Sequence, residues 1–483
     1  MVFPPGKARF VFFGKNSAFS TGSLIAGSIV TSLINIAMLP VIARAYGPTA
    51  IGIGSIFVAL HSFLLIVATG RYSLAIPLPK SEISAKYLIL IVAMLATSFG
   101  LFIAIAGLSF GDQIGAVLSM PEISIWIPWL GLMSAVAGLF EAVNYWLVRN
   151  KKFHTKSILN VSHTLFYLGC LTIGAFLADA SIFNYMQAIV IGTVGAGFCL
   201  SVFVLAKTSI PRLRWSRIVS LASYYRHLPK HLLTTGVINN ASTISLPIVL
   251  AIFSGPVAVA SYTLTAQVLG RPFSLVSSSI WQVVYGNLGN ADNNANFKTR
   301  ELEGIYNFTS LLYCIPLIAC VALADRAVYF LGDQWSGIGP IIGLYLIMAY
   351  FQFSSNSISY FQSFGKYSAE SVANTTLIIT RFGAIIFASL LGLDAYHTIL
   401  IFCVSSALVY LAITTYWSYV FNFGPRLPLR GIGFFAISYT LALLAKQYLE
   451  HWTLYLLLFF VLTAIFIACI KYYRDRSLGH ARA

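Results

Sequence analysis

The sequence predicts an all-α polytopic membrane protein with about 14 transmembrane helices, and two observations support this fold class. Of its 483 residues, 58% are apolar and only 9% are charged, whereas about a quarter of the residues in a soluble domain are charged. Apolar runs of about 20 residues recur between short polar breaks, and this is the length that an α-helix needs to cross the hydrocarbon of a bilayer.

Six apolar runs occupy the first 206 residues. A Gly-Pro corner at Gly47-Pro48 separates the first two, because neither residue favours the middle of a helix. Short polar loops separate the others, such as the acidic loop around Asp112 and Glu122 and the basic loop that begins at Arg149. The predicted helices are residues 19–44, 50–70, 87–110, 123–148, 158–178 and 183–206.

Eight more runs follow residue 231. A second Gly-Pro corner, Gly255-Pro256, separates the first two of them, and a short loop at Asp394 separates two others. The predicted helices are residues 232–254, 258–285, 306–331, 339–364, 371–392, 397–421, 432–449 and 452–470.

The connection between these two sets, residues 207–231, is basic and amphipathic. Leu213, Trp215, Ile218 and Val219 stand among its arginines. This pattern is typical of a helix that lies on the membrane surface against anionic lipid, and also of a basic linker between two bundles. The two interpretations are compatible.

Basic residues predict the orientation, because Lys and Arg collect in cytoplasmic loops. An even number of spans places both termini on one side, and 25 of the 30 basic residues fall on that side. We therefore expect both termini to be cytoplasmic. The net charge of +16 is then mostly an orientation signal, and no nucleic-acid partner is expected.

The two Gly-Pro corners resemble each other, which indicates an internal duplication. Gly47 to Gly52 and Gly255 to Ala260 share the pattern Gly-Pro-x-Ala-(Ile/Val)-(Gly/Ala), and a proline precedes each. Orientation places both corners on the external face, so we expect an outer gate to bend there. The predicted hinge residues are Pro40, Gly47, Pro48, Pro247, Gly255 and Pro256.

Two arginines lie near the middle of predicted helices. An arginine at that depth costs about 3 kcal/mol on insertion scales, so Arg271 and Arg381 should face protein or a water-filled cavity. A guanidinium group suits phosphate or carboxylate. Both are therefore candidate substrate-binding residues of a cationic cleft, and structural pairing with a buried acid or with carbonyl groups is the alternative.

Other polar groups in predicted helices are weaker candidates. Glu141 could couple transport to proton movement, or it could neutralise one of the two arginines. Amide side chains suit hydroxyl-rich ligands, although hydrogen bonding between helices explains them equally well. The amides expected to line the cleft are Asn35, Asn239, Asn240 and Gln267.

Catalytic and nucleotide-binding motifs are absent from the sequence. It contains no GxxxxGK(S/T), no HExxH and no Cys/His cluster with metal-ligand spacing. We therefore expect neither an enzyme nor a bound cofactor or metal.

Three short motifs resemble the bacterial polysaccharide-biosynthesis flippases of the Wzx type. Ala43-Arg44-Ala45-Tyr46-Gly47-Pro48 resembles the opening of that family, and Leu74 to Lys80 is similar to its AI-x-x-P-K segment. Gly332-Asp333-Gln334-Trp335 resembles its external G-x-x-W loop.

This resemblance implies membership of the multidrug/oligosaccharidyl-lipid/polysaccharide exporter superfamily. Its fold would be two pseudo-symmetric six-helix bundles that face each other across a cleft, with two extra C-terminal helices. The predicted domains are an N-terminal bundle at 1–206, the linker at 207–231, a C-terminal bundle at 232–421, and the last two helices with a basic tail at 422–483.

The implied function is turnover of undecaprenyl-pyrophosphate-linked oligosaccharide from the cytoplasmic to the external leaflet by alternating access. The cargo would be a repeat unit of O-antigen, capsule or exopolysaccharide. From their membrane position rather than from a family motif, we expect Arg271 to engage its charged headgroup with Arg381 across the cleft. Expected partners are this lipid-linked oligosaccharide, membrane lipid, and a polymerase and chain-length regulator of the same pathway.

Two alternatives stay open at this stage. One is a cation-coupled multidrug exporter of the same superfamily, although two intramembrane arginines against one glutamate favour an anionic cargo. The other is a membrane glycosyltransferase or O-antigen polymerase, which typically has a large external loop that this sequence lacks. Neither the sugar, the coupling ion nor the oligomeric state follows from the sequence.

Overall fold

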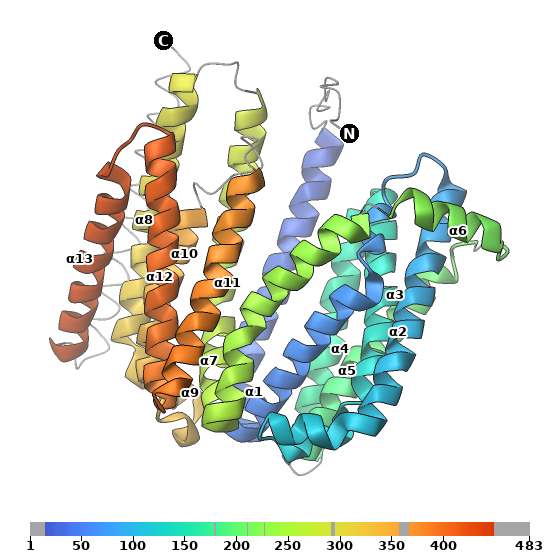
Figure 1. Cartoon of the computed structure of the whole chain (residues 1–483), viewed down its shortest axis with the longest axis horizontal. Coiled ribbons are helices and arrows are strands. Elements are labelled where there is room, and N and C mark those ends of the chain that lie inside the picture. Colours follow the sequence, from blue (N-terminus) through green and yellow to red (C-terminus); the bar gives the residue numbers. More distant parts are fainter. Residues whose placement is uncertain are drawn as a thin grey trace. The chain divides into compact units, whose positions relative to one another are not determined.

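A computed structural model describes residues 15–177, 180–209, 211–226, 228–290, 295–356 and 367–448. Throughout these ranges the regular structure is helical, with no strand, as the apolar runs predict (Figure 1). The fold class is therefore confirmed. The last predicted span, 452–470, lies outside the described residues.

The first half of the chain contains the first six predicted spans. Ser181 caps α5, because its hydroxyl accepts a hydrogen bond from the backbone N–H of Asn184 at 3.2 Å. The elements are α1 (Lys15–Thr69), η1 (Tyr72–Ala75), α2 (Glu82–Val117), η2 (Pro121–Trp126), α3 (Trp129–Arg149), α4 (Phe153–Leu177), α5 (Ile182–Leu205) and α6 (Trp215–Tyr224).

The second half begins with a π-helical turn that leads into the longest helix. Asp394 caps α12 by accepting a hydrogen bond from the backbone N–H of His397 at 3.0 Å. The elements are η3 (Pro229–Leu233), α7 (Thr234–Asn290), α8 (Ala295–Ala322), η4 (Ala324–Arg326), α9 (Ala327–Leu331), η5 (Asp333–Trp335), α10 (Ile338–Asn356), α11 (Tyr367–Leu390), α12 (Ala395–Val420) and α13 (Arg426–Tyr448).

Two long helices each contain a pair of predicted spans. The helix α1 is interrupted at Gly47, with φ 73° and ψ 174°, and α7 is interrupted at Gly255, with φ 78° and ψ 178°. These are conformations that glycine adopts and other residues avoid. Each of the two breaks falls in the Gly-Pro corner that the sequence predicts.

Two other predicted spans differ in detail. The predicted helix 123–148 starts as the 3₁₀ turn η2, and its α-helix begins only at Trp129. The predicted helix 306–331 is broken, because α8 ends at Ala322 and the turn η4 separates it from α9. An ion pair between Asp325 and Lys446, 2.8 Å long, holds this turn to α13.

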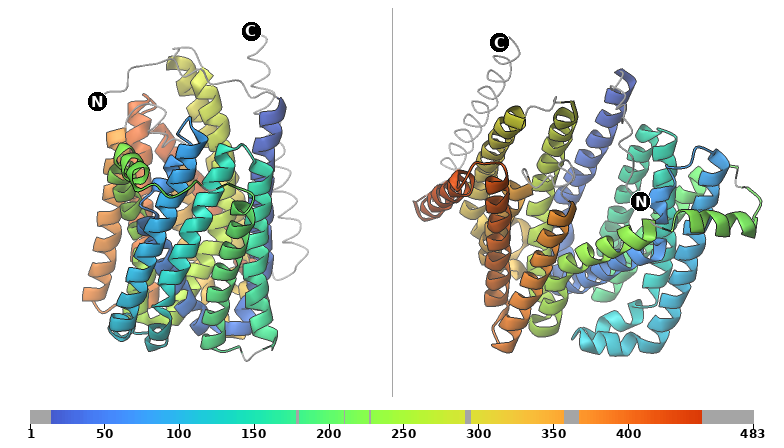
Figure 2. Two further views of the ribbon diagram at one scale, coloured as in Figure 1. Left: turned by 90° about the vertical axis from the view of Figure 1, so that its right-hand side faces the viewer. Right: turned by 45° about the horizontal axis from the view of Figure 1, so that its top comes forward.

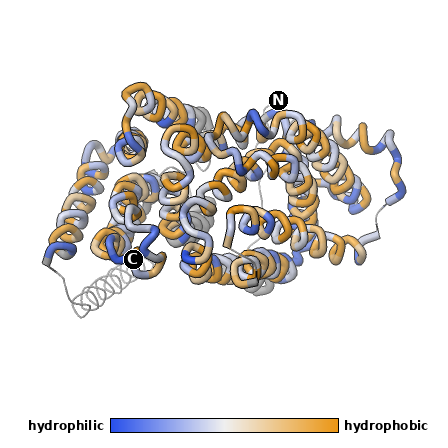
Figure 3. The backbone as a smooth tube through the Cα atoms, turned by 90° about the horizontal axis from the view of Figure 1, so that it is seen from below, coloured by the Kyte–Doolittle hydropathy of each residue, from blue (hydrophilic) through white to orange (hydrophobic). Residues whose placement is uncertain are grey.

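Eleven described helices are long and apolar enough to cross a membrane. Figure 3 shows that hydrophobic residues cover most of their length. Large apolar side chains are also exposed on them, for example Leu108 at 78% and Leu390 at 82%. Lipid is the solvent in which such a surface is stable, so the chain is a multi-pass membrane protein.

The described contacts divide the chain into two compact units. Unit 1 comprises Met1–Leu39, His61–Gly111 and Trp126–Val237, and unit 2 comprises Pro40–Leu60, Asp112–Ile125 and Ile238–Ala483. The second unit thus includes the stretch of α1 around the Gly47 corner. The domain boundaries expected at 206 and 231 stay predictions.

Each unit is held by close helix packing. In unit 1, α5 packs along both α3 and α4, and α2 meets α3 at a glycine contact, where a Cβ on Gly100 would lie only 2.4 Å from the carbonyl oxygen of Gly131. In unit 2, α10 and α11 pack against α12, and α8 packs against α10 and α13 (Figure 2).

Candidate functional site

Arg381 is buried on α11, and hydroxyl groups and aromatic rings surround its guanidinium group. Its Nε donates a hydrogen bond to the Ser406 hydroxyl at 3.2 Å, and an Nη donates to the Tyr410 hydroxyl at 3.3 Å. The guanidinium carbon lies 5.3 Å from the centre of the Phe402 ring. Neutral acceptors and a ring face thus contribute to stabilising this buried cation, as expected for an intramembrane arginine.

Aromatic side chains continue from this arginine toward α7. The ring of Tyr262 on α7 lies 6.2 Å from Phe402 and 6.1 Å from Tyr345, with edge-to-face geometry in both pairs. The Tyr345 hydroxyl lies 3.0 Å from the point where a Cβ on Gly270 would stand. Gly270 directly precedes Arg271, so a chain of aromatic contacts leads from Arg381 to the neighbour of the second candidate arginine.

Arg271 is half-buried on α7. The Ser274 hydroxyl donates a hydrogen bond to its backbone carbonyl at 2.8 Å, and Phe273 packs against Tyr313 and Phe353. Both candidate arginines therefore belong to the second unit, on α7 and α11, and Arg271 is the more accessible of the two. Their role in binding stays a prediction.

Glu141 lies in the first unit on α3, and its carboxylate accepts a hydrogen bond from the Ser73 hydroxyl at 2.7 Å. Arg71 is close enough to stabilise its negative charge. The guanidinium of Arg71 fits against Gly236, where a Cβ would lie 2.8 Å from one of its nitrogens. The charged neighbour of Glu141 is thus a loop arginine that sequence reasoning did not single out.

The candidate amides occupy different environments. Asn35 is half-buried and donates to the carbonyl of Thr31 in its own helix at 2.7 Å. Asn240 is half-buried and Gln267 is exposed, both on α7. The side chain of Asn239 lies outside the described residues.

The two Gly-Pro corners pack together within the second unit. Gly52 lies so close to Pro256 that a Cβ on it would stand 1.9 Å from the proline carbonyl oxygen. Thr263 donates a hydrogen bond to the Ser55 hydroxyl at 3.0 Å. Ser55 and Thr263 each stand eight residues after the glycine of their own corner, so the structure joins equivalent positions of the two repeats.

The G-x-x-W segment holds the first corner from the side. The buried indole of Trp335 donates to the carbonyl of Ala43 at 3.2 Å, and the Gln334 amide donates to the carbonyl of Arg44 at 3.1 Å. Arg44 in turn donates to the carbonyls of Tyr329 and Phe330. Sequence reasoning used these residues only for a family resemblance. Arg44 is one of the few basic residues that fall outside the predicted cytoplasmic side, and this feature of the sequence could have indicated a structural role for it.

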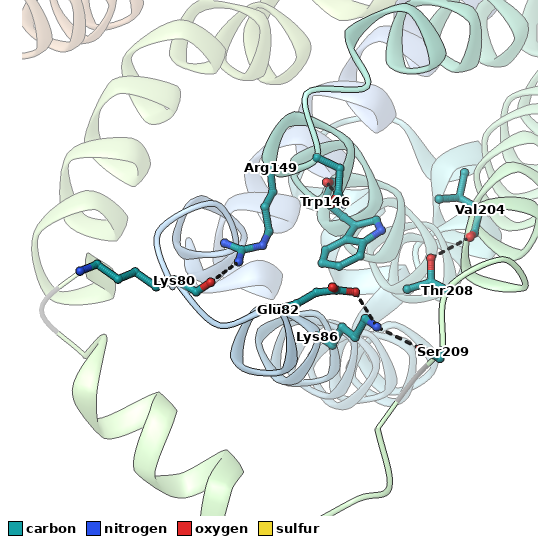
Figure 4. Close-up of polar contacts among 9 residues, drawn as sticks. Lys80, Glu82, Lys86, Trp146, Arg149, Val204, Thr208 and Ser209 are labelled. Carbon is teal, nitrogen blue, oxygen red and sulfur yellow. Dashed lines mark hydrogen bonds and ion pairs between the residues drawn. The ribbon is translucent and has the colours of Figure 1, made fainter. Parts of the chain in front are cut away.

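A polar cluster lies where the N-terminal end of α2 meets the C-terminal end of α3 (Figure 4). It fixes the segment that resembles AI-x-x-P-K. Arg149 donates to the carbonyl of Lys80, as Figure 4 shows, and also to the carbonyls of Pro77 and Pro79, so it fixes the turn before α2. Lys86 pairs with Glu82 at 2.8 Å and donates to Ser209 at 3.0 Å. These contacts lie at the end that the basic residues predict to be cytoplasmic.

A family described as "Polysaccharide biosynthesis protein" matches residues 41–340. Among solved structures, the chain is similar to the lipid II flippase MurJ in an inward closed conformation, with 14% identity over 95% of this chain and 99% of that one and a TM-score of 0.70. It is also similar to an inward-facing multidrug resistance MATE family transporter of the MOP superfamily, with 12% identity over 82% of this chain and 98% of that one and a TM-score of 0.59. No curated protein matches the sequence. At these identities the structural likeness establishes the fold alone.

Proposed function

Because this chain belongs to the polysaccharide biosynthesis protein family, we propose that it is a flippase for undecaprenyl-pyrophosphate-linked oligosaccharide. The cargo is a repeat unit of O-antigen, capsule or exopolysaccharide, and it moves from the cytoplasmic to the external leaflet of the bacterial inner membrane by alternating access. Both termini of the protein are cytoplasmic in this proposal.

The observation that carries the proposal is the pair of arginines in membrane-spanning helices of one unit. Arg381 is held by Ser406 and Tyr410, and Arg271 lies half-buried on α7. Fixed cations in a medium of low dielectric constant favour an anionic cargo, since their attraction for a phosphate is far stronger there than in water. A pyrophosphate headgroup meets this requirement, while its lipid tail stays in the bilayer.

Transport rather than catalysis fits the rest of the molecule. The solved structures with the same fold are a flippase and transporters. Many polar side chains in the described helices donate hydrogen bonds to the backbone of their own helix, as Thr31 and Thr172 do.

Cation-coupled multidrug export is the second candidate, because the fold is shared with a multidrug transporter and Glu141 supplies an intramembrane acid. Purified protein offered a pyrophosphate lipid and a cationic dye separates the two. We expect binding of the lipid. Binding of the dye without the lipid would reject the flippase and support the exporter.

Substitution of Arg271 tests the proposed site directly. Arg271→Ala should abolish surface-polysaccharide export at normal expression, and Arg271→Lys should retain part of it, because a lysine keeps the charge without the planar fork of donors. Export is measured as polysaccharide on the cell surface.

Arg426→Ala is the matched control, since Arg426 is an exposed arginine of the same unit. Its export should equal that of the unaltered protein. Normal export by the Arg271→Ala variant would remove Arg271 from the mechanism.

A further inference from the structure

The short helix α6 is fixed to the first unit by one face only. Ile218 and Tyr225 on this face are buried in the hydrophobic core of the unit, and Leu221 and Ala222 are partly buried against the same core. These four positions follow the i, i+3, i+4, i+7 spacing of a single helix face.

Two tyrosine hydroxyls set the position of α6 along the spanning helices. Tyr87, in the second turn of α2, donates to the carbonyl of Arg212 at 2.8 Å, and Tyr72 donates to the carbonyl of Ala222 at 3.0 Å. The helix therefore runs across the ends of α2 and α3, at the level where the spans begin (Figures 1 and 2). The ends of membrane-spanning helices lie near the lipid headgroups.

A second apolar sector of α6 lies directly beside the face that packs on the protein core. Trp215 and Val219 are 62% and 63% exposed, and they share one side of the helix because they are four residues apart. At about 100° per residue, this sector borders the buried face on one side. Its other neighbour is a polar sector made by Ser216, Ser220 and Ser223.

This arrangement differs from that of a helix that only docks on its own protein. Such a helix needs one apolar face, and water can surround the remainder. In α6 an exposed tryptophan and an exposed valine lie between the protein-facing residues and the serines. This is the arrangement of a helix that lies flat in the membrane–water interface, with one side in lipid and another in water.

The charge around α6 identifies the lipid. Residues 207–231 contain six Lys and Arg and no Asp or Glu. Within the described part of the chain no ion pair joins these six to a carboxylate. Arginines at positions 212, 214, 217 and 226, within α6 or next to it, are exposed. Clusters of basic residues beside a membrane span attract anionic phospholipid.

We propose that α6 is a lipid-binding helix, in which Trp215 and Val219 insert among the acyl chains near the headgroups while the neighbouring arginines bind anionic phospholipid. The helix thereby anchors the connection between the two halves of the chain to the membrane surface. This site is separate from the arginines on α7 and α11, and it requires no cargo.

The position of Trp215 is measured on the full chain in lipid nanodiscs. The emission of the unaltered protein minus that of the Trp215→Phe variant isolates this one tryptophan from the other seven. We expect phospholipid brominated on the upper part of its acyl chains to quench this difference signal, and aqueous iodide to leave it. Quenching by iodide and not by brominated lipid would overturn the proposal, because the face would then be open to water or to a soluble partner.

The preference for anionic lipid is measured with the same signal. Brominated phosphatidylglycerol should quench Trp215 more than brominated phosphatidylcholine does, and the double variant Arg214→Gln, Arg217→Gln should lose this difference. Lys151→Gln with Lys152→Gln is the control, because it removes two exposed charges from another loop of the unit. Equal quenching by both lipids in the unaltered protein, or equal loss in both double variants, would overturn the assignment.

Discussion

At the scale of single residues, Arg381 combines a structural environment with a position suited to function. Two of its hydrogen bonds reach the hydroxyl groups of Ser406 and Tyr410, and burying a charge is costly unless it serves a purpose beyond packing. An apolar side chain of similar length would fill the same space between α11 and α12 without that cost. Stability and export therefore separate the two roles.

Arg381→Met should keep most of the thermal stability of the purified protein and lose export. Arg381→Ala should cost about 1–3 kcal/mol of stability, because the Ser406 and Tyr410 hydroxyls lose this donor and a void remains. Both variants are compared by thermal unfolding in detergent and by surface polysaccharide. Normal export by a stable Arg381→Met protein would show that the guanidinium has only a packing role.

Residue positions could be predicted from the sequence more readily than their partners. The places of Arg271, Arg381 and Glu141 within predicted spans follow from counting residues along the apolar runs, which requires only the linear sequence. The contact between Glu141 and Ser73 spans 68 residues and depends on a left-handed residue, Arg71, that starts the 3₁₀ turn. No local pattern encodes such a pairing.

At the scale of elements, the two corners have the same backbone conformation but different surroundings. A Cβ on Gly47 would lie 2.6 Å from the Oε1 of Gln334, whereas a Cβ on Gly255 would meet nothing within 4 Å. Both positions have φ values that disfavour any side chain, at a cost on the order of 1–3 kcal/mol. Only at Gly47 would a Cβ also meet a neighbour, the end of the flexible Gln334 side chain, which would have to shift and give up its hydrogen bond to the Arg44 carbonyl.

Gly255→Ala should therefore destabilise the protein by the backbone cost alone, and Gly47→Ala should destabilise it further. Thermal unfolding of the two variants measures the difference. Combining Gln334→Ala with Gly47→Ala should remove the additional loss of stability at Gly47. The same Gln334→Ala change should leave the effect of Gly255→Ala unchanged. A larger loss for Gly255→Ala than for Gly47→Ala would contradict this account of the corners.

Hydropathy predicted where the helices lie, but it did not predict the break within the span 306–331. The predicted span 306–331 is one helix despite the charged pair Asp325-Arg326, whereas in the structure the helix breaks there at η4, where Asp325 pairs with Lys446 of α13. A tertiary ion pair between positions 121 residues apart stabilises that turn. The breaks at Gly47 and Gly255 could be predicted because glycine and proline encode them locally.

At the scale of the whole molecule, the internal repeat acquires a physical meaning. Ser55 and Thr263 occupy equivalent places in the two repeats, and they are joined by a hydrogen bond. A contact between equivalent positions arises where a local two-fold axis passes between them, as in a symmetric dimer. The sequence motif indicated two related corners, and the structure shows that they meet each other.

Such a contact is a suitable place for an outer gate. In the proposed flippase, alternating access would require that the ends of the repeats at these corners separate in one state and meet in the other. The close approach of Gly52 to Pro256 and the hydrogen bond between Ser55 and Thr263 describe the meeting state. Separation would have to break both of them, together with the contacts of Trp335 and Gln334 to the first corner.

A covalent lock tests whether this separation occurs. Cysteines at both Ser55 and Thr263 place two thiols where hydroxyl oxygens are 3.0 Å apart, so oxidation or a short thiol cross-linker should join them. We expect export to stop in the cross-linked double variant and to return after reduction, while each single-cysteine variant treated identically keeps exporting and so controls for the six native cysteines. Export that continues through a completely cross-linked protein would mean that the two corners stay together throughout transport, and that the cargo leaves by a route that does not pass between them.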